Sequence, residues 1–413
     1  MTTLHVTNAY HAASGGIRTF YHALLDAGNR EGRRVVLVVP GRHTEVAEVG
    51  RFGRIYFIRA SHAPVFDRRY RLLLPHYFLP GLRTTLVRIH EEERPDIIEV
   101  CDKYSLPYLA AMIRKGWHHG VRRPTLVGLS CERFDDAMAA YLTPNAGARA
   151  FTQWYLRNIY GPPFDVHIAV SEYTAGELRT ALHDRAPGFI RVCPHGVDSV
   201  GFSPDRASGA TRARRLREAG GDDRSVLLFY AGRLSPEKNI GLLVQMLGEL
   251  MAVGEADYRL VIAGDGPLAP WLRSQAGDVA SRIHLCGTLD REALAEHYAS
   301  CDVFVHPNPR EPFGIGPLEA MASGVPVVLP NCGGVLEYAS MRNSWPASPD
   351  ARAFASAVAA ARRGDRDRVR RAIETARQFR WSRVTNEYFA LYDQVQGRFW
   401  GSRSPEAAPV PIL

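Results

Sequence analysis

The sequence predicts an α/β fold of two doubly wound domains, each built like a Rossmann domain. Short apolar runs rich in β-branched residues alternate with helical stretches, which is typical of parallel strands buried on both faces. The series begins at Leu4, closes near Asp198, and restarts at Val226 after a polar stretch over residues 200–224. A length of 413 residues is enough for two domains of ordinary size.

The first domain is expected to span residues 1–198. Its strands are predicted at residues 4–7, 35–39, 55–59, 97–100, 126–129 and 166–170. Its helices are predicted at residues 17–27, 82–93 and 171–182. Parallel strands need crossover helices between them, so this alternation favours a doubly wound sheet.

The second domain is expected to span residues 199–382 and to begin with a linker and a surface helix over residues 200–224. Its strands are predicted at residues 226–230, 259–263, 283–285, 303–306 and 327–329, and its helices at 240–250, 268–276, 291–299 and 318–322. We expect the two domains to face a central cleft that binds a ligand. The Ser-, Pro- and Ala-rich residues 401–413 are expected to form a disordered tail.

Composition argues against several classes of protein. No apolar run approaches the roughly 20 residues of a membrane-spanning helix, and the first residues are expected to form a strand rather than a signal peptide. The six cysteines are scattered without a Cys-x-x-Cys pair, which indicates a reduced, cytoplasmic protein without a zinc site.

Arginine carries almost all of the positive charge, since the chain has a net charge of +8 and lysine only at positions 103, 115 and 238. Residues 51–90 hold an arginine cluster that is interleaved with aromatic and aliphatic residues and contains one acid, Asp67. One interpretation is a peripheral membrane contact or a surface for an acidic acceptor. The other is a solvated helix face whose arginine stems cover apolar surface. No nucleic-acid-binding motif accompanies the cluster, so no nucleic-acid partner is expected.

The most informative segment is Glu311-Pro-Phe-Gly-Ile-Gly-Pro-Leu-Glu319. It forms a glycine-rich turn beyond the carboxyl end of the predicted strand 303–306, where open α/β sheets bind ligands. Carboxylates repel phosphate and accept hydrogen bonds from hydroxyls, so Glu311 in the turn and Glu319 near the helix start favour contacts to a sugar or a ribose. The alternative is a strand–turn–helix connection with two surface acids.

Two further segments follow predicted strands and suit phosphate. Arg233 stands at the end of strand 226–230 and Lys238 before the next helix, and their cationic groups match the charge of a diphosphate. The alternative there is a helix capped by Ser235 with a solvated Lys238. Gly15 and Gly16 follow the first strand and would let the backbone approach an anion, although most such loops are only tight turns.

In chain order, from Gly15-Gly16 through Arg233 and Lys238 to Glu311–Glu319, these three segments resemble the family-four retaining glycosyltransferases of GT-B fold. The resemblance covers nearly the whole chain and includes His195-Gly-Val-Asp198, Leu260-Val-Ile-Ala-Gly-Asp-Gly-Pro267 and Phe379-Arg-Trp-Ser382. It implies a C-terminal helix, at about residues 383–400, that crosses back to complete the first domain. It also implies an acceptor-binding first domain and a second domain that binds a nucleoside-diphosphate sugar.

The resemblance implies a role for each motif residue. Arg233 and Lys238 would neutralise the donor diphosphate, Glu311 would contact the donor sugar, and Glu319 would hold the ribose hydroxyls. The donor-binding set would be Gly15, Gly16, Arg233, Lys238, Phe313, Gly314, Ile315 and Glu319. The catalytic set would be Arg233, Lys238, Glu311, Cys131 and Glu132.

The reaction implied is the retaining transfer of a hexose to an acceptor hydroxyl by front-face attack, in which the leaving phosphate accepts the acceptor's proton. Arg233 and Lys238 would meet the negative charge that develops on the diphosphate, so neither a metal nor a cofactor is expected. The acidic pair Asp365 and Asp367 lies among arginines on a helical stretch and does not favour a metal site.

One position departs from the family pattern. Many members carry a histidine after the strand that here covers residues 126–129, whereas this chain has Cys131 followed by Glu132. A thiol has an ordinary pKa of about 8.5 and would stay mostly neutral in a dry site. Glu132 or His11 would then compensate, unless Cys131 is simply a small buried hydrophobe.

Two other functions stay open. One is a GT-B-fold phosphorylase or epimerase, and the other is a sugar-nucleotide-binding protein that lost catalysis through Cys131. Residues 101–106 and 130–135 resemble bacterial α-mannosyltransferases, which favours a hexose such as mannose. The acceptor is expected to be a small molecule, a lipid or a glycan, with the 51–90 cluster and residues 117–119 as candidate surfaces.

Overall fold

The structure is a computed structural model, and it describes residues 1–11, 15–63, 70–79, 84–117, 123–141, 146–185, 188–275 and 278–401. The chain divides into two units, Met1–Pro194 with Ser382–Leu413 and His195–Trp381. The sequence places the border four residues later, after residue 198. Apart from Gly401, the expected tail at residues 401–413 lies outside the described residues.

The first unit contains an eight-stranded sheet in the order β3-β4-β2-β1-β5-β6-β7-β8. Neighbouring strands are parallel except for the antiparallel pair β3 and β4. The strands are β1 (Thr2–Thr7), β2 (Arg34–Gly41), β3 (Glu45–Val49), β4 (Gly53–Arg59), β5 (Ile97–Cys101), β6 (Thr125–Ser130), β7 (Val166–Ala169) and β8 (Ile190–Val192). Every residue of β5, β6 and β7 is buried, which explains why these strands are mostly apolar in the sequence.

The helices of the first unit fall between its strands, as the alternation predicts. They are α1 (Gly15–Glu31), α2 (Thr85–Glu93), α3 (Pro107–Arg114), α4 (Phe134–Tyr141), α5 (Ala146–Tyr155) and α6 (Glu172–Ala181). The sequence reading missed β3 and β8, the two edge strands of the sheet. Both are short and partly exposed, so neither has the apolar run of a central strand.

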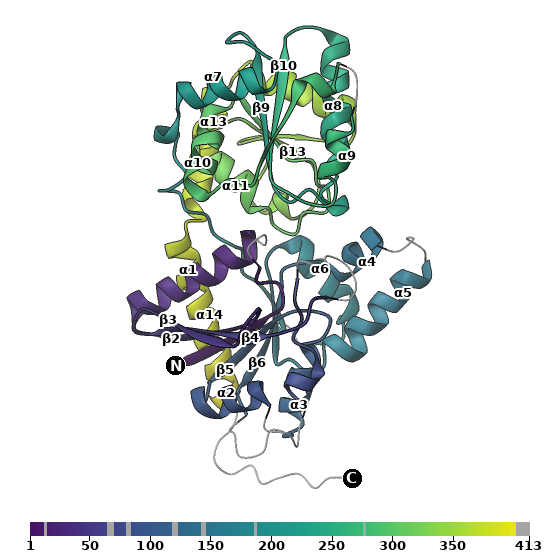
Figure 1. The fold of residues 1–413 in the computed structure, drawn as a ribbon. Coiled ribbons are helices and arrows are strands. Elements are labelled where there is room, and N and C mark those ends of the chain that lie inside the picture. Colours follow the sequence, from purple (N-terminus) through teal and green to yellow (C-terminus); the bar gives the residue numbers. More distant parts are fainter. Residues whose placement is uncertain are drawn as a thin grey trace. The chain divides into compact units, whose positions relative to one another are not determined.

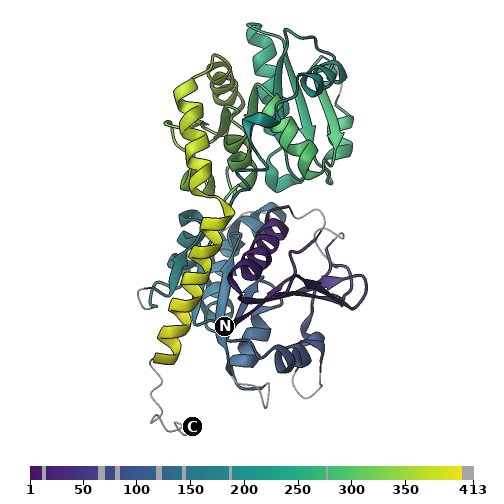
Figure 2. The same cartoon turned by 90° about the vertical axis from the view of Figure 1, so that its left-hand side faces the viewer.

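The C-terminal helix α14 (Trp381–Gly401) returns the chain to the first unit. The Tyr388 hydroxyl donates to the carbonyl oxygen of Cys193 over 2.8 Å, and the Tyr392 hydroxyl donates to Oε2 of Glu99 on β5 over 2.5 Å. The Tyr388 ring also lies 4.9 Å from that of Phe20 on α1. In Figure 2 the yellow helix runs along this unit. The predicted helix that crosses back is therefore confirmed.

The second unit contains six parallel strands in the order β11-β10-β9-β12-β13-β14. They are β9 (Val226–Ala231), β10 (Tyr258–Ala263), β11 (Ile283–Gly287), β12 (Val303–Val305), β13 (Val327–Pro330) and β14 (Trp345–Ala347). Helices cover both faces, with α8 (Gly241–Val253) and α9 (Ala269–Arg273) on one side and α10 (Arg291–Ser300) and α11 (Ile315–Ala322) on the other (Figure 1). The unit also contains α7 (Gly209–Glu218), α12 (Ala351–Arg362) and α13 (Arg366–Gln378). The two doubly wound sheets confirm the predicted fold class.

Two details of the second unit differ from the elements predicted from the sequence. Helix α11 begins at Ile315, three residues before the predicted start, because Gly314 turns the chain at a φ of 85° and Pro317 is tolerated in a first helical turn. Strand β14 was missed because it has three residues and contains Pro346, which is confined to sheet edges.

The strand order reverses direction at β9 in the second unit. The chain proceeds from β9 to β10 and β11 on one side, then crosses to β12 on the other. Loops that leave the carboxyl ends of β9 and β12 therefore diverge, and ligands of open α/β sheets bind at such a point. Arg233 follows β9 and Glu311 follows β12. Among the described helices, none combines the length and the apolar character that crossing a membrane requires.

Candidate active site

Glu311 lies at the centre of a polar cluster beyond the end of β12. The residue is only 8% exposed, which rules out the alternative of a surface acid at this position. Its Oε2 atom lies 2.8 Å from Nζ of Lys238 and accepts a hydrogen bond from Nδ2 of Asn308 over 2.9 Å. Nε2 of His306 approaches the same oxygen at 3.3 Å. Residues from two loops, 73 positions apart, thus meet on one carboxylate.

These neighbours decide the charge of Glu311. Burial by itself favours the neutral acid, but the Lys238 ammonium group and the contact with His306 outweigh it and hold the pKa of Glu311 well below its usual range. The carboxylate is therefore ionised at neutral pH. An ionised carboxylate is a strong acceptor for hydroxyl groups, as the hydrogen-bonding interpretation requires.

Glycines fix the turn that carries Glu311. Gly314 has a φ of 85°, and its carbonyl oxygen accepts a hydrogen bond from the Tyr338 hydroxyl over 2.5 Å. Gly334 donates its backbone N–H to the Glu311 carbonyl oxygen over 2.7 Å, and a Cβ at Gly334 would lie 1.8 Å from the carbonyl oxygen of Pro312. The turn is thus closed by backbone contacts that a side chain at Gly334 would prevent.

Phe313 and Ile315 flank that turn. Phe313 is 2% exposed, and its ring packs edge-on against those of Tyr338 at 5.3 Å and His195 at 5.9 Å. Ile315 is the first residue of α11. The family resemblance implies that the backbone amides of this stretch lie near the donor sugar, and the buried Phe313 ring holds this backbone in place.

Glu319 lies in the second turn of α11 rather than at the start of the helix, where the sequence reading placed it. Burial raises the pKa of its carboxyl group to about 8, although a hydrogen bond with the Tyr298 hydroxyl and the charge of Arg291 lower it. Its charge state at neutral pH therefore differs from that of Glu311, even though the two residues belong to one segment.

Arg233 and Lys238 occupy the loop that leaves β9. NH2 of Arg233 lies 3.0 Å from Oε1 of Glu237, and Lys238 ends a short 3₁₀ turn over Pro236–Lys238. The next residue, Asn239, adopts a φ of 53° and donates to the Pro307 carbonyl oxygen over 3.1 Å, which ties this loop to the one after β12. Lys238 is ion-paired and its side chain is only 21% exposed, so the alternative of a solvated lysine is wrong.

Gly15 and Gly16 lie in the first unit as the exposed first two residues of α1. A Cβ at Gly15 would meet no atom within 4 Å, so packing does not require glycine at that position. Ser14 lies outside the described residues. The open helix start is compatible with the approach of an anion.

Cys131 and Glu132 follow β6 in the first unit. The Sγ atoms of Cys131 and Cys101 are 3.5 Å apart, and burial raises the pKa of the Cys131 thiol. Burial also raises the pKa of Glu132, against the opposing charge of Lys103. Both groups are thus shifted towards their neutral forms. His11, the other residue expected to compensate for Cys131, places its ring 5.4 Å from that of Tyr70.

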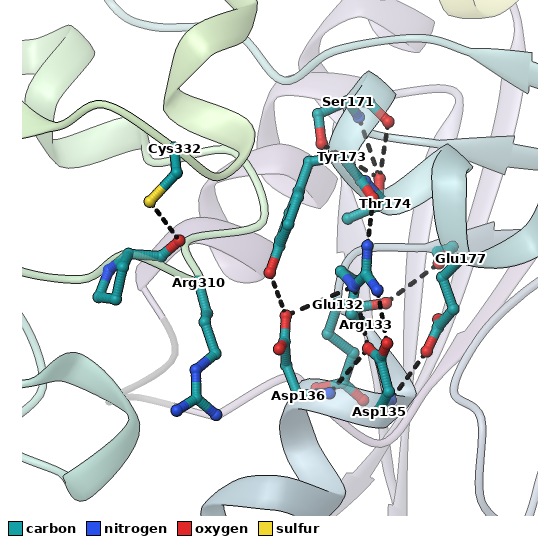
Figure 3. A network of polar contacts seen from close by, with 12 residues as sticks. Glu132, Arg133, Asp135, Asp136, Ser171, Tyr173, Thr174, Glu177, Arg310 and Cys332 are labelled. Carbon is teal, nitrogen blue, oxygen red and sulfur yellow. Dashed lines mark hydrogen bonds and ion pairs between the residues drawn. The ribbon is translucent and has the colours of Figure 1, made fainter. Parts of the chain in front are cut away.

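Figure 3 shows the polar network that surrounds Glu132. Arg133 donates from Nε to Oδ1 of Asp135 over 2.9 Å and from NH1 to the Tyr173 carbonyl oxygen over 3.1 Å. Asp135 in turn donates its backbone N–H to Oε1 of Glu177 over 2.8 Å. The segment after β6 is therefore held by several contacts to α6.

The sequence reading missed His306, Asn308 and Tyr298, which contact the two glutamates. His306 and Asn308 directly follow β12, so their position at a strand end was a usable signal. Tyr298 comes from α10, and only tertiary packing brings it to Glu319.

The arginine cluster is distributed over several elements, so it is not a single helix face. Arg54 on β4 pairs with Glu93 over 2.8 Å and with Glu48 over 2.7 Å, while Arg88 is exposed on α2. Residues 64–69 and 80–83 of the cluster, and residues 118–119 beside the exposed Trp117, lie outside the described residues.

Asp365 and Asp367 form ion pairs with Arg368 and Arg370 at the start of α13, over 3.4 and 3.0 Å. Within the described part of the chain, no three His, Cys, Asp or Glu side chains gather where they could hold a metal ion.

Two protein families match the chain. The model described as "Glycosyltransferase Family 4" matches residues 14–200, and the one described as "Glycosyl transferases group 1" matches residues 225–362. The chain is 33% identical over 395 residues to a GDP-mannose-dependent α-(1-6)-phosphatidylinositol dimannoside mannosyltransferase of Mycobacterium tuberculosis, covering 94% of this chain and 95% of that protein. It is 27% identical over 325 residues to a GDP-mannose-dependent α-mannosyltransferase of Corynebacterium glutamicum, covering 78% of this chain and 70% of that protein.

Solved structures share the fold at low sequence identity. A sucrose-phosphate synthase of Thermosynechococcus elongatus superposes with a TM-score of 0.75 at 18% identity, covering 98% of this chain and 100% of that one. Anabaena HepE in complex with UDP-glucose gives a TM-score of 0.68 at 14% identity, covering 95% and 100%. These structures show the GT-B fold, and the match to the mycobacterial mannosyltransferase over almost the full length of the chain shows the family. This chain therefore belongs to the family-four glycosyltransferases of GT-B fold.

Proposed function

We propose that the protein transfers mannose from GDP-mannose to an acceptor hydroxyl, with retention of the anomeric configuration and without a metal ion. The observation that carries the proposal is the ionised Glu311 beside Lys238 at the point where the strand order of the second unit reverses. A carboxylate for sugar hydroxyls and a cation for phosphate then lie side by side, as a sugar diphosphate requires.

The transfer step follows from the charges that develop. The bond between the sugar C1 and the diphosphate oxygen breaks, and its electron pair stays on the diphosphate. Arg233 and Lys238 stabilise this added negative charge. The acceptor oxygen bonds to C1 from the same face, and its proton passes to the leaving phosphate oxygen. No side chain is then needed as a dedicated base.

Glu311 and Glu319 would bind opposite ends of the donor. Glu311, ionised, accepts hydrogen bonds from hydroxyls of the mannose. Glu319, with a pKa raised to about 8, both donates to and accepts from the ribose hydroxyls while it is protonated. In the first unit, Cys131 and Glu132 would assist the sugar, and Gly15 and Gly16 would approach the diphosphate.

The names of the two relatives support the donor, since both are described as GDP-mannose-dependent. The mycobacterial relative is named for a phosphatidylinositol dimannoside, so we propose a mannosylated inositol phospholipid as the acceptor class. An anionic lipid of this kind would be attracted to a protein with a net charge of +8, including the exposed Arg88.

A thermal-shift screen of nucleoside diphosphates and sugar nucleotides tests the donor, because a ligand that binds only the native state raises its melting temperature. We expect GDP and GDP-mannose to raise it more than the uridine and adenosine counterparts. A larger shift with UDP or ADP derivatives would reject the proposed base, and no shift with any of them would reject the nucleotide-sugar donor.

Product analysis tests the reaction class. With GDP-mannose and a mannosylated phosphatidylinositol we expect GDP and an α-linked mannose, detected by NMR, at an equal rate with and without EDTA. A β-linked product would reject retention, and a loss of turnover in EDTA would reject metal independence. Release of mannose 1-phosphate in the presence of inorganic phosphate would indicate a phosphorylase instead.

A further inference from the structure

A buried ion pair lies behind the segment that carries Cys131 and Glu132. Lys103 and Glu177 are each 1% exposed, and Nζ of the lysine lies 2.9 Å from Oε2 of the glutamate. One of the three lysines of the chain is therefore buried inside the first unit. Lysine and glutamate are rarely fully buried unless they are paired, and a buried pair carries a large desolvation cost.

Both partners also form hydrogen bonds with the segment after β6. Nζ of Lys103 donates to the Glu132 carbonyl oxygen, which also accepts from Oγ of Ser130 over 3.1 Å. Oε1 of Glu177 accepts the backbone N–H of Asp135 over 2.8 Å. One ion pair therefore binds the main chain at both ends of Glu132–Asp135, as the contacts drawn around Glu132 and Glu177 in Figure 3 partly show.

Both partners are themselves held firmly. The Lys103 carbonyl oxygen accepts the Tyr155 hydroxyl over 2.7 Å, and Nζ lies 5.8 Å from the centre of the Tyr160 ring. Glu177 lies on α6, whose start is capped by a reciprocal pair of hydrogen bonds between Ser171 and Thr174. A rigid helix and an anchored loop thus fix the two ends of the pair.

We propose that the Lys103–Glu177 pair is a positioning device, which holds the main chain of Glu132–Asp135 so that Cys131 and Glu132 serve the sugar transfer. Both side chains are sealed from solvent, so the pair would act through this segment rather than by contact with a substrate. This inference rests on the proposed function for its link to catalysis, whereas the clamp itself is a property of the first unit alone.

The alternative is a purely structural role, in which the pair contributes to folding and nothing else. A matched control separates the two. The Tyr392 hydroxyl donates to Glu99 over 2.5 Å, and both residues are fully buried in the same unit. Tyr392→Phe removes this bond and leaves the hydrogen bonds to Glu132–Asp135 in place.

The test uses the full chain with Lys103→Met and Glu177→Gln, singly and together. Each single change leaves a buried charge without its partner and is expected to destabilise the protein. The double variant removes both charges, and it keeps an amide oxygen for the Asp135 N–H, so it is the variant expected to fold. Circular dichroism and melting temperature establish which variants are folded.

The first readout is independent of catalysis. Cys131 is only partly exposed in the folded protein, so the rate at which a maleimide alkylates it, followed by peptide mass spectrometry, rises when this segment opens more often. We expect the double variant to react at least about tenfold faster than the wild type, because local opening becomes easier when a buried bond to the segment is lost. Tyr392→Phe is expected to react at the wild-type rate. An unchanged rate in a folded double variant overturns the proposal.

The second readout links the clamp to the reaction. We expect kcat of the double variant to fall by at least about tenfold, as displaced catalytic groups imply, while the thermal shift caused by GDP stays unchanged because Arg233 and Lys238 are intact. An unchanged kcat overturns the positioning role. If the wild type transfers no sugar, the proposed function fails, and the alkylation rates still decide whether the clamp exists.

Discussion

Each unit places a lysine–glutamate pair next to a segment that follows a buried parallel strand, but the two pairs differ in access to solvent. The side chains of Lys238 and Glu311 are 21% and 11% exposed, whereas those of Lys103 and Glu177 are 2% and 0% exposed. A ligand can share an accessible pair, but a sealed pair can interact only with the protein. The comparison suggests that similar ion pairs serve a substrate in one unit and hold the chain in the other.

The largest expected effect comes from Lys238→Met. The substitution removes a cation that meets the charge of the leaving diphosphate, and the loss of one such stabilising group costs about 10²–10³ in kcat. Steady-state transfer assays measure it. Lys115→Met is the matched control, because Lys115 is an exposed lysine of the first unit. If Lys238→Met were as active as the wild type, Lys238 would not stabilise the leaving diphosphate.

Glu311→Gln should have the next largest effect. A neutral amide cannot replace an ionised acceptor, and a hydrogen bond to a charged group contributes about 1.5–3 kcal/mol, or roughly 10–10²-fold in kcat/KM. The exposed Glu292→Gln serves as the control in the same unit. If Glu311→Gln transferred mannose as well as this control, the sugar contact would have to be assigned to another residue.

Glu319→Gln should remove a pH-dependent contribution to stability. The pKa of Glu319 rises from an ordinary 4.5 to about 8 in the folded protein, so the native state binds more protons than the unfolded chain between these values. The contribution is fully present below pH 4.5 and is lost as the pH rises through 8. Melting temperatures from pH 5 to 9 should therefore show a growing advantage for Glu319→Gln, while its response to GDP weakens. A constant difference across the range would contradict the raised pKa.

The smallest effect is expected for Cys131→Ser in the first unit. Burial raises the pKa of this thiol, so the thiol stays neutral. The substitution therefore removes at most one neutral hydrogen bond, worth about 1 kcal/mol or roughly fivefold in kcat. The same transfer assay measures it, with Cys193→Ser as a buried control. A loss beyond about a hundredfold, equal to about 2.7 kcal/mol, would make Cys131 essential to catalysis.

Much of the fold could be predicted from the sequence because central parallel strands are buried on both faces and read as apolar runs. Strands β1, β2, β9 and β10 were all expected within three residues of their ends. The edge strands β3, β8 and β14 were not, because partial exposure or proline weakens that signal. The start of α11 was misplaced because the left-handed Gly314 sets it rather than the apolar pattern.

The sequence by itself determined which residue types follow the strand ends: Arg233 and Lys238 after β9, and Glu311 after β12. Only the tertiary structure decided their protonation. Glu311 and Glu319 lie in one short segment, yet Lys238 keeps the pKa of the first low and burial raises that of the second to about 8. The reason is physical: a pKa depends on neighbouring charges and on access to water, and folding supplies both from distant parts of the chain.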